Sequence, residues 1–130
     1  MNVLEIRTVY FCLNTLNNIP MEIVDILQDG VVILELKGRL DTTNYSFLEE
    51  KIMKLIDDNQ TLILVDCSDL SYISSSGLRI MLMGLKKINS VKGKFILCCL
   101  QDNIREIFEI SGFTSIFSIF PTRQDALKQF

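Results

Sequence analysis

The sequence predicts an α/β fold in which a mixed β-sheet opens with an N-terminal hairpin and helices pack on the sheet. The first observation is a pair of apolar runs, residues 22–27 and 31–36, on either side of Asp29-Gly30. An Asp-Gly turn between such runs is a strong signal for an antiparallel hairpin. The second is that later apolar runs are continuous, as in strands covered on both faces, and are separated by segments of helical period. This alternation predicts parallel strands joined by right-handed helical crossovers.

Composition narrows the class of protein. A chain of 130 residues suits a single domain, and 48% hydrophobic with 22% charged residues indicates a globular protein rather than a disordered one. The formal net charge is −3 and the lysines are scattered, which disfavours a nucleic-acid partner. No apolar run approaches the roughly 18 residues of a membrane-spanning helix, so we expect a soluble protein without membrane insertion.

Residues 1–20 are predicted to be an N-terminal extension of uncertain structure, and residues 21–130 the main domain. Residues 9–13 are apolar enough for a short strand or helix, but the run is too short for a signal peptide. Two alternatives stay open: an extra element packed on the edge of the domain, or a translated stretch upstream of the natural start. We favour the second, because the segment has little periodicity.

After the hairpin, residues 38–41 are predicted to form a loop, and Thr42 or Thr43 to cap a helix that runs to about Asn59. The next strand, Leu62–Val65, is expected to end at Asp66. The apolar stripe of the predicted first helix consists of Phe47, Leu48, Ile52, Leu55 and Ile56.

A second helix is predicted to begin near Ser76, which places the three serines 74–76 at its N-terminus. Serine is favoured there because its hydroxyl can accept a hydrogen bond from a backbone N–H that has no partner inside the helix. The same N–H groups favour a phosphate. Ile80 and Met83 lie off the main apolar stripe, so this helix is either buried on two sides or keeps one side for a partner. The main stripe consists of Leu78, Met81, Leu82, Leu85 and Ile88.

The C-terminal third is predicted to contain a buried strand at residues 94–100 and a short helix that Asp102 or Asn103 caps and Gly112 ends. A last strand at residues 116–120 and a final helix at residues 125–130 complete the chain.

The sequence offers little for catalysis or metal binding. It contains no histidine, no Cys-x-x-Cys pair, no hydrolase nucleophile elbow and no phosphate-binding glycine loop. We therefore expect no metal, no cofactor and no enzymatic activity. Cys98 and Cys99 are adjacent in a predicted buried strand, where free cysteine behaves as a small apolar residue, and this indicates a reducing cytoplasmic compartment.

One stretch carries a specific resemblance. From Asp66 to Leu78 the chain reads Asp-x-Ser-x-Leu-x-Tyr-Ile-x-Ser-Ser-Gly-Leu, which resembles the signature of the STAS family. This domain is shared by anti-sigma factor antagonists and the cytoplasmic tails of sulphate transporters. The resemblance extends over residues 21–130 and implies a STAS-like mixed sheet. In antagonists a partner kinase phosphorylates the serine two positions before the glycine, which corresponds to Ser75. Many of them carry aspartate where this chain has Ser74.

The resemblance implies a binding switch. The unmodified protein would bind an anti-sigma factor that is also a serine kinase and so release a sigma factor, and phosphorylation at Ser75, reversed by a phosphatase, would end the capture. The Gly-x-Leu-Asp piece that ends at Asp41 also resembles a family loop that contributes to partner binding. The residues expected to form the binding surface are Leu40, Asp41, Ser74, Ser75, Ser76, Gly77, Ile80 and Met83.

An alternative remains open. The chain could be a STAS subunit that binds a membrane transport complex, with Ser75 acting as a structural helix cap that is never phosphorylated.

Overall fold

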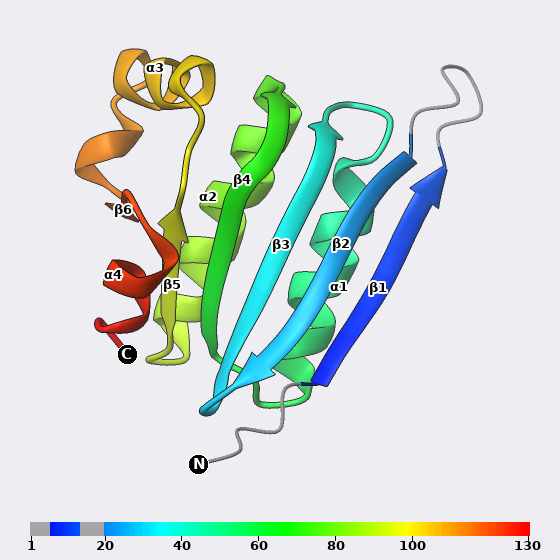
Figure 1. Ribbon diagram of the computed structural model, residues 1–130, viewed down its shortest axis with the longest axis vertical. Coiled ribbons are helices and arrows are strands. Elements are labelled where there is room, and N and C mark those ends of the chain that lie inside the picture. Colours follow the sequence, from blue (N-terminus) through cyan, green and yellow to red (C-terminus); the bar gives the residue numbers. More distant parts are fainter. Residues whose placement is uncertain (1–5, 14–19) are drawn as a thin grey trace.

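The computed structural model describes residues 6–13 and 20–130, which form one six-stranded sheet with helices on both faces (Figure 1). The strands are β1 (Ile6–Leu13), β2 (Pro20–Gln28), β3 (Val31–Leu40), β4 (Leu62–Ile73), β5 (Lys94–Cys98) and β6 (Ser118–Phe120). The helices are α1 (Tyr45–Asp57), α2 (Ser75–Ser90), α3 (Asp102–Ile110), the 3₁₀ turn η1 (Phe113–Ser115) and α4 (Arg123–Leu127).

The sheet is mixed, as predicted. Its strands lie in chain order from β1 to β6. The pairs β1–β2 and β2–β3 are antiparallel, whereas β3–β4, β4–β5 and β5–β6 are parallel. In Figure 1, α1 and α2 lie behind the sheet and α4 lies in front of it, beside β5. The crossovers through α1 and α2 therefore bring the C-terminal ends of β3 and β4 to one edge of the molecule.

The two faces of the sheet carry two separate apolar cores. The larger one lies under α1, α2 and α3, where Leu36, Ile52, Val65 and Phe108 are buried. The smaller one lies on the opposite face and includes Ala126 of α4. The N-terminal halves of β3 and β4, and β5 after Lys94, are thus buried on both faces, which explains their continuous apolar runs.

The hairpin at Asp29 and Gly30 is confirmed. Both residues have positive φ, 53° and 80°, as the two central positions of a type I′ turn require, and this turn matches the twist of the flanking strands. Strands β2 and β3 pair without interruption from Gln28↔Val31 to Glu22↔Lys37.

The predicted end of the fourth strand was wrong, and so was the predicted loop at residues 38–41. Strand β4 continues through the whole signature to Ile73, and β3 continues to Leu40, with Leu40 paired to Ile73. Register shifts follow Glu35 and Gly38 of β3. These irregularities break the two-residue alternation of β4, so its polar second half did not look like a strand in the sequence.

Several helix ends also differ from expectation. Asn44, rather than a threonine, precedes α1, and Gln101 precedes α3 without a side-chain cap. The last strand begins only at Ser118, after a 3₁₀ turn, and Thr122 caps α4 through the Asp125 N–H. The predicted stop at Gly112 is confirmed, because this residue follows α3 with a φ of 76°.

Residues 6–13 are part of the same sheet. They form β1, which pairs with β2 from Ile6↔Leu27 to Leu13↔Pro20. The ring of Tyr10 packs against the larger core, and Lys51 of α1 lies over it, 4.1 Å from the ring centroid. Lys51 Nζ also lies 2.5 Å from Asp25 Oδ2 on β2. A domain boundary at Met21 and the position of the natural start stay predictions.

Candidate functional site

The three serines stand at the edge of the molecule where β3 and β4 end, at the first turn of α2 (Figure 1). Ser74 is the N-cap residue: its backbone is extended, and its Oγ accepts a hydrogen bond from the Gly77 N–H at 3.2 Å. Ser75 is the first helical residue and is exposed, while Ser76 is half-buried. The cap that the alternative interpretation assigned to Ser75 is therefore supplied by Ser74.

The first turn of α2 is fixed to the end of β3. The Ser74 N–H donates to the Leu40 carbonyl at 2.9 Å. Gly77 permits this approach, because a Cβ at its position would lie 2.7 Å from Ile73 Cγ1 and 2.9 Å from Leu40 Cγ. The signature glycine thus has a packing reason, and it places Ser75 in a defined position.

The neighbouring turn after β3 is held by side-chain hydrogen bonds. Asn44 Oδ1 accepts from the Asp41 N–H at 2.9 Å, and Asn44 Nδ2 donates to the Arg39 carbonyl at 2.7 Å. Asp41 Oδ1 in turn accepts from the Thr43 N–H at 2.9 Å. Buried Asn44 therefore fixes the turn that begins at Asp41, directly after Leu40, whose carbonyl accepts from the Ser74 N–H.

Burial separates the predicted binding residues into two groups. Leu40, Gly77 and Ile80 are buried, so these residues support the surface from beneath rather than form it. The accessible members are Asp41, Ser74, Ser75, Ser76 and Met83, of which Ser75 is exposed and the others are half-buried.

The outer side of α2 was missed by the sequence analysis. Arg79, Leu82 and Lys86 follow Ser75 at steps of four, three and four residues, so they share its side of the helix. With Met83 and Lys87 they line a shallow groove of about 330 Å³. The apolar stripe had been assigned Leu78 and Leu82, but both are half-exposed, whereas Ile80 and Gly84 are buried. The alternation of basic and apolar residues over residues 79–87 was the sequence signal that could have indicated this exposed side of α2.

The first residue of the signature, Asp66, has a structural role on the other face of the sheet. Its Oδ2 accepts from Arg123 Nε at 2.9 Å, and its Oδ1 accepts from the Ser68 N–H at 2.9 Å. Arg123 also pairs with Glu35 of β3. Burial alone would raise the pKa of Asp66, but the hydrogen bonds from Ser68 and Arg123 outweigh it and hold the pKa below its ordinary value. This cluster attaches α4 to β3 and β4.

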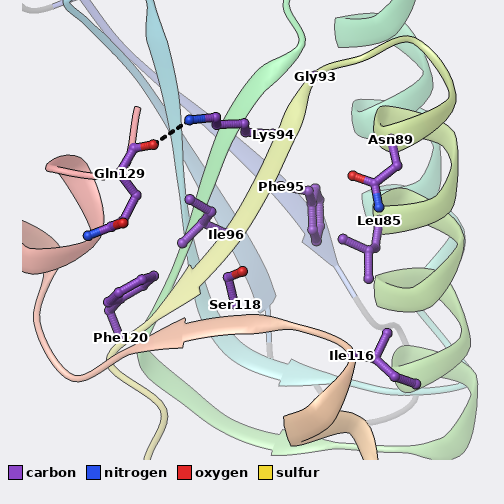
Figure 2. A pocket seen from close by; sticks show the side chains of 10 residues that line it. All are labelled: Leu85, Asn89, Gly93, Lys94, Phe95, Ile96, Ile116, Ser118, Phe120 and Gln129. Carbon is purple, nitrogen blue, oxygen red and sulfur yellow. Dashed lines mark hydrogen bonds between the residues drawn. The ribbon is translucent and has the colours of Figure 1, made fainter.

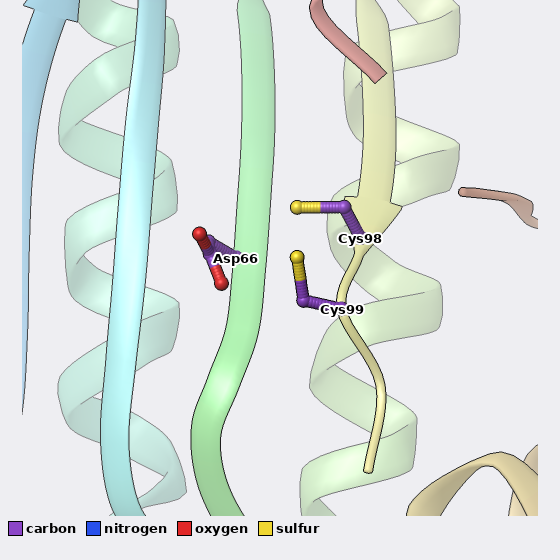
Figure 3. Close-up of side chains that lie close together, drawn as sticks. All are labelled: Asp66, Cys98 and Cys99. Atoms are coloured by element: carbon purple, nitrogen blue, oxygen red, sulfur yellow. The ribbon is translucent and has the colours of Figure 1, made fainter. Parts of the chain in front are cut away.

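Asp66 also lies close to Cys98 and Cys99, three side chains whose types could in principle bind a metal ion (Figure 3). Their three ligand atoms lie within 4.8 Å of one another. Burial and the neighbouring carboxylate raise the pKa of both thiols, which keeps them protonated at neutral pH, and metals bind thiolates. The carboxylate oxygens are already occupied by Ser68 and Arg123. These side chains do not fit a metal ion, and the expected absence of metal elsewhere stays a prediction.

A cavity of about 310 Å³ lies at the other end of α2, between that helix and the strands β5 and β6 (Figure 2). Lys94 is the one charged residue in its lining, and its Nζ donates to the Gln129 carbonyl at 2.6 Å. The lining lacks a pair of groups suited to acid–base or nucleophilic chemistry. This cavity is therefore not the candidate site.

In the described ranges, no helix is long and apolar enough to cross a membrane.

Comparison with known proteins agrees with this geometry. Residues 22–126 match the model of the STAS domain family. BtrV of Bordetella bronchiseptica, named as an anti-sigma factor antagonist, is 38% identical over 102 residues, which cover 78% of this chain and 88% of BtrV.

Two solved structures share the fold. An anti-sigma factor antagonist from Thermotoga maritima superposes with a TM-score of 0.75 and 24% identity, covering 87% of this chain and 94% of its own. The Bacillus cell fate determinant SpoIIAA in its phosphorylated form superposes with a TM-score of 0.63 and 23% identity, covering 92% and 98%.

Proposed function

This chain belongs to the STAS domain family of anti-sigma factor antagonists, and on that premise we propose that it is a phosphorylation-controlled binding switch. Unmodified, it captures an anti-sigma factor that is also a serine kinase and thereby releases a sigma factor. Phosphorylation at Ser75 ends the capture, and a phosphatase restores it. The protein acts in the cytoplasm by binding rather than by catalysis.

The observation that carries this proposal is the separation of two roles between adjacent serines. Ser74 caps α2 from a half-buried position, whereas the Ser75 hydroxyl lies outside the cap and is exposed to a kinase. A phosphate on Ser75 would add about −1.5 to −2 charges at the positive end of a helix dipole, where an anion is tolerated. Modification should therefore change the surface without unfolding the domain.

The proposed binding surface is formed by the accessible residues around that hydroxyl. Ser76 follows Ser75 in the first turn of α2, Met83 lies two turns along that helix, and Asp41 directly follows Leu40, whose carbonyl accepts from the Ser74 N–H. The Ser74 N–H bond to the Leu40 carbonyl joins the start of α2 to the end of β3, and the Asp41 N–H bond to Asn44 Oδ1 fixes the next turn, which favours a rigid patch. A rigid patch loses little conformational entropy on binding, which favours capture by the unmodified form.

The test uses a purified anti-sigma factor kinase from the same genome. Incubation with the kinase and ATP, followed by phosphopeptide mass spectrometry, should place a single phosphate on Ser75. Without ATP the two proteins should co-elute on size-exclusion chromatography, and after the reaction they should separate.

Two single-serine variants test which serine carries the phosphate. Ser75→Ala should keep co-elution and refuse the phosphate, while Ser76→Ala should keep both. Phosphate that appears only at Ser74 or Ser76 would contradict the assignment of Ser75. Absence of both capture and phosphorylation for every such kinase would refute the proposed function.

A further inference from the structure

The outer side of α2 has a charge pattern that sets it apart from the rest of the chain. The helix carries three basic residues, Arg79, Lys86 and Lys87, and no acidic one, although the whole chain has a net charge of −3. We use the term cationic stripe for Arg79, Leu82, Met83, Lys86 and Lys87.

The basic side chains of the stripe have no charged partner within the described part of the chain. There, the side chains of Arg79, Lys86 and Lys87 form no ion pair and no hydrogen bond; the Ser90 hydroxyl donates only to the Lys87 backbone carbonyl. By contrast, Lys37 and Lys54 each pair with a carboxylate at 3.8 Å. The three basic side chains of the stripe are all exposed.

Apolar side chains lie between these charges. Leu82 and Met83 are half-exposed and line the shallow groove of about 330 Å³ together with the basic residues. Their own helix leaves them accessible because the buried side of α2 is already filled by Ile80, Met81 and Leu85. A partner that covers the groove would remove apolar surface from water and bring its own charges close to the stripe.

The stripe is continuous with the serine switch. Ser75, Arg79, Leu82 and Lys86 fall within about 60° on one side of the helix, at about 100° per residue, and span roughly 16 Å along it. A phosphate on Ser75 would lie one helical turn from Arg79, at a spacing where opposite charges on a helix attract.

We propose that the cationic stripe binds an acidic surface of the captured anti-sigma factor, one in which apolar side chains lie among carboxylates. This inference rests on the proposed function and adds the chemistry of the partner and the means of its release. Phosphate on Ser75 neutralises Arg79 within the chain and repels the partner's carboxylates. Release then results from a change in the charge of the whole stripe as well as from local steric exclusion.

The test measures capture of the purified anti-sigma factor kinase by calorimetry, without ATP, at about 0.05 M and about 0.5 M salt. The double variant Arg79→Glu with Lys86→Glu should bind at least about tenfold more weakly than wild type at low salt, and the difference should shrink at high salt. The double variant Arg79→Lys with Lys86→Arg keeps both positive charges, and its affinity for the kinase should stay within about threefold of wild type.

Lys128→Glu is the control for a single charge reversal away from the stripe, half the charge change of the double variant, because exposed Lys128 directly follows α4, which lies on the opposite face of the sheet. The affinity of the Lys128→Glu variant for the kinase should stay within about twofold of wild type. Thermal melts should show that all variants fold, since the changed side chains are exposed.

Two failures can be told apart. Wild-type capture that is insensitive to salt and unchanged in the double variant would overturn this inference and leave the proposed function intact. No capture by the wild-type chain would refute the proposed function and this inference with it.

Discussion

Adjacent residues at the start of α2 have different tasks, and the sequence alone could not assign them. Three serines in a row are equally suited to cap a helix, but the Ser74 Oγ accepts the Gly77 N–H and the Ser75 side chain stays outside. The motif did identify the correct turn, because the helix begins within one residue of the predicted position. What it could not supply was the backbone geometry that chooses the cap.

The first prediction separates these two serines by stability. Ser74→Ala should lower the free energy of unfolding by about 1 kcal/mol, because the Gly77 N–H loses its acceptor. Ser75→Ala should change it by less than about 0.5 kcal/mol, since the side chain is exposed and is not the cap. Urea denaturation followed by circular dichroism measures both values. A larger loss for Ser75→Ala would show that the capping role had been assigned to the wrong serine.

The second prediction concerns Gly77. Gly77→Ala should lower the stability by about 1 kcal/mol or more, because the new methyl group would press against Ile73 and Leu40 at atoms that cannot swing away. Gly84→Ala is the comparison, since a Cβ there comes no nearer than 3.1 Å to its neighbours, Ile52 Cδ1 and Phe95 Cε2, and alanine also favours the helix. Thermal melts should give Gly77→Ala a clearly lower melting temperature than Gly84→Ala. The reverse order would contradict the packing argument.

At the scale of elements, the sequence predicted the turns and helix ends that local chemistry determines. It missed the strand extent that depends on pairing between distant segments. The Asp29-Gly30 hairpin, the stop at Gly112 and the helix after the serines follow from turn and cap chemistry. The second half of β4 does not, because Ser68–Ile73 becomes a strand only by pairing with β3, in a register where β4 carries an extra residue at two places. The outer side of α2 was misassigned because a helix rich in apolar residues on two sides does not reveal which side faces the sheet.

The third prediction concerns β1. A variant that lacks residues 1–13 should lose about 3 kcal/mol or more of its free energy of unfolding, because β2 would lose its outer partner and Tyr10 would leave the core. Val9→Ser, at a side chain 41% exposed, should cost less than about 1 kcal/mol. Denaturant titration gives both numbers. A truncated chain within about 1 kcal/mol of the full one would instead support the view that the domain begins at Met21.

At the scale of the whole molecule, the two faces of the sheet have separate tasks. One face holds α1 and α2 and positions the serine edge, while the other is closed by α4 through Arg123. Arg123 and Asp66 are 57 residues apart, a pairing that no local pattern could indicate. The signature therefore links the faces, because it begins with the anchor of α4 and ends with the start of α2.

The fourth prediction is the pH dependence of that anchor. Because the pKa of Asp66 is lower in the folded state than its ordinary value of 3.8, its contribution to stability is complete at neutral pH and is lost as the pH falls through and below that value. Asp66→Asn should therefore be less stable than wild type by about 2 kcal/mol at pH 7, and the gap should narrow below about pH 4. Thermal melts across this range measure the gap.

Asp69→Asn is the control, since Asp69 forms an exposed pair with Lys37 at 3.8 Å. It should change stability by less than about 1 kcal/mol at every pH. An Asp66→Asn gap that stays constant down to pH 2.5 would show that the carboxylate charge is not what stabilises the cluster.

The central claim is that phosphate on Ser75 removes binding without removing the fold. The most direct measurement is titration calorimetry of the anti-sigma factor kinase with unmodified protein and with protein phosphorylated at Ser75, beside thermal melts of both forms. We expect the phosphorylated form to bind more than about tenfold more weakly, a difference above about 1.4 kcal/mol, while its melting temperature stays within a few degrees of the unmodified form. Equal affinities for the two forms, or a phosphorylated form that is largely unfolded, would contradict the switch.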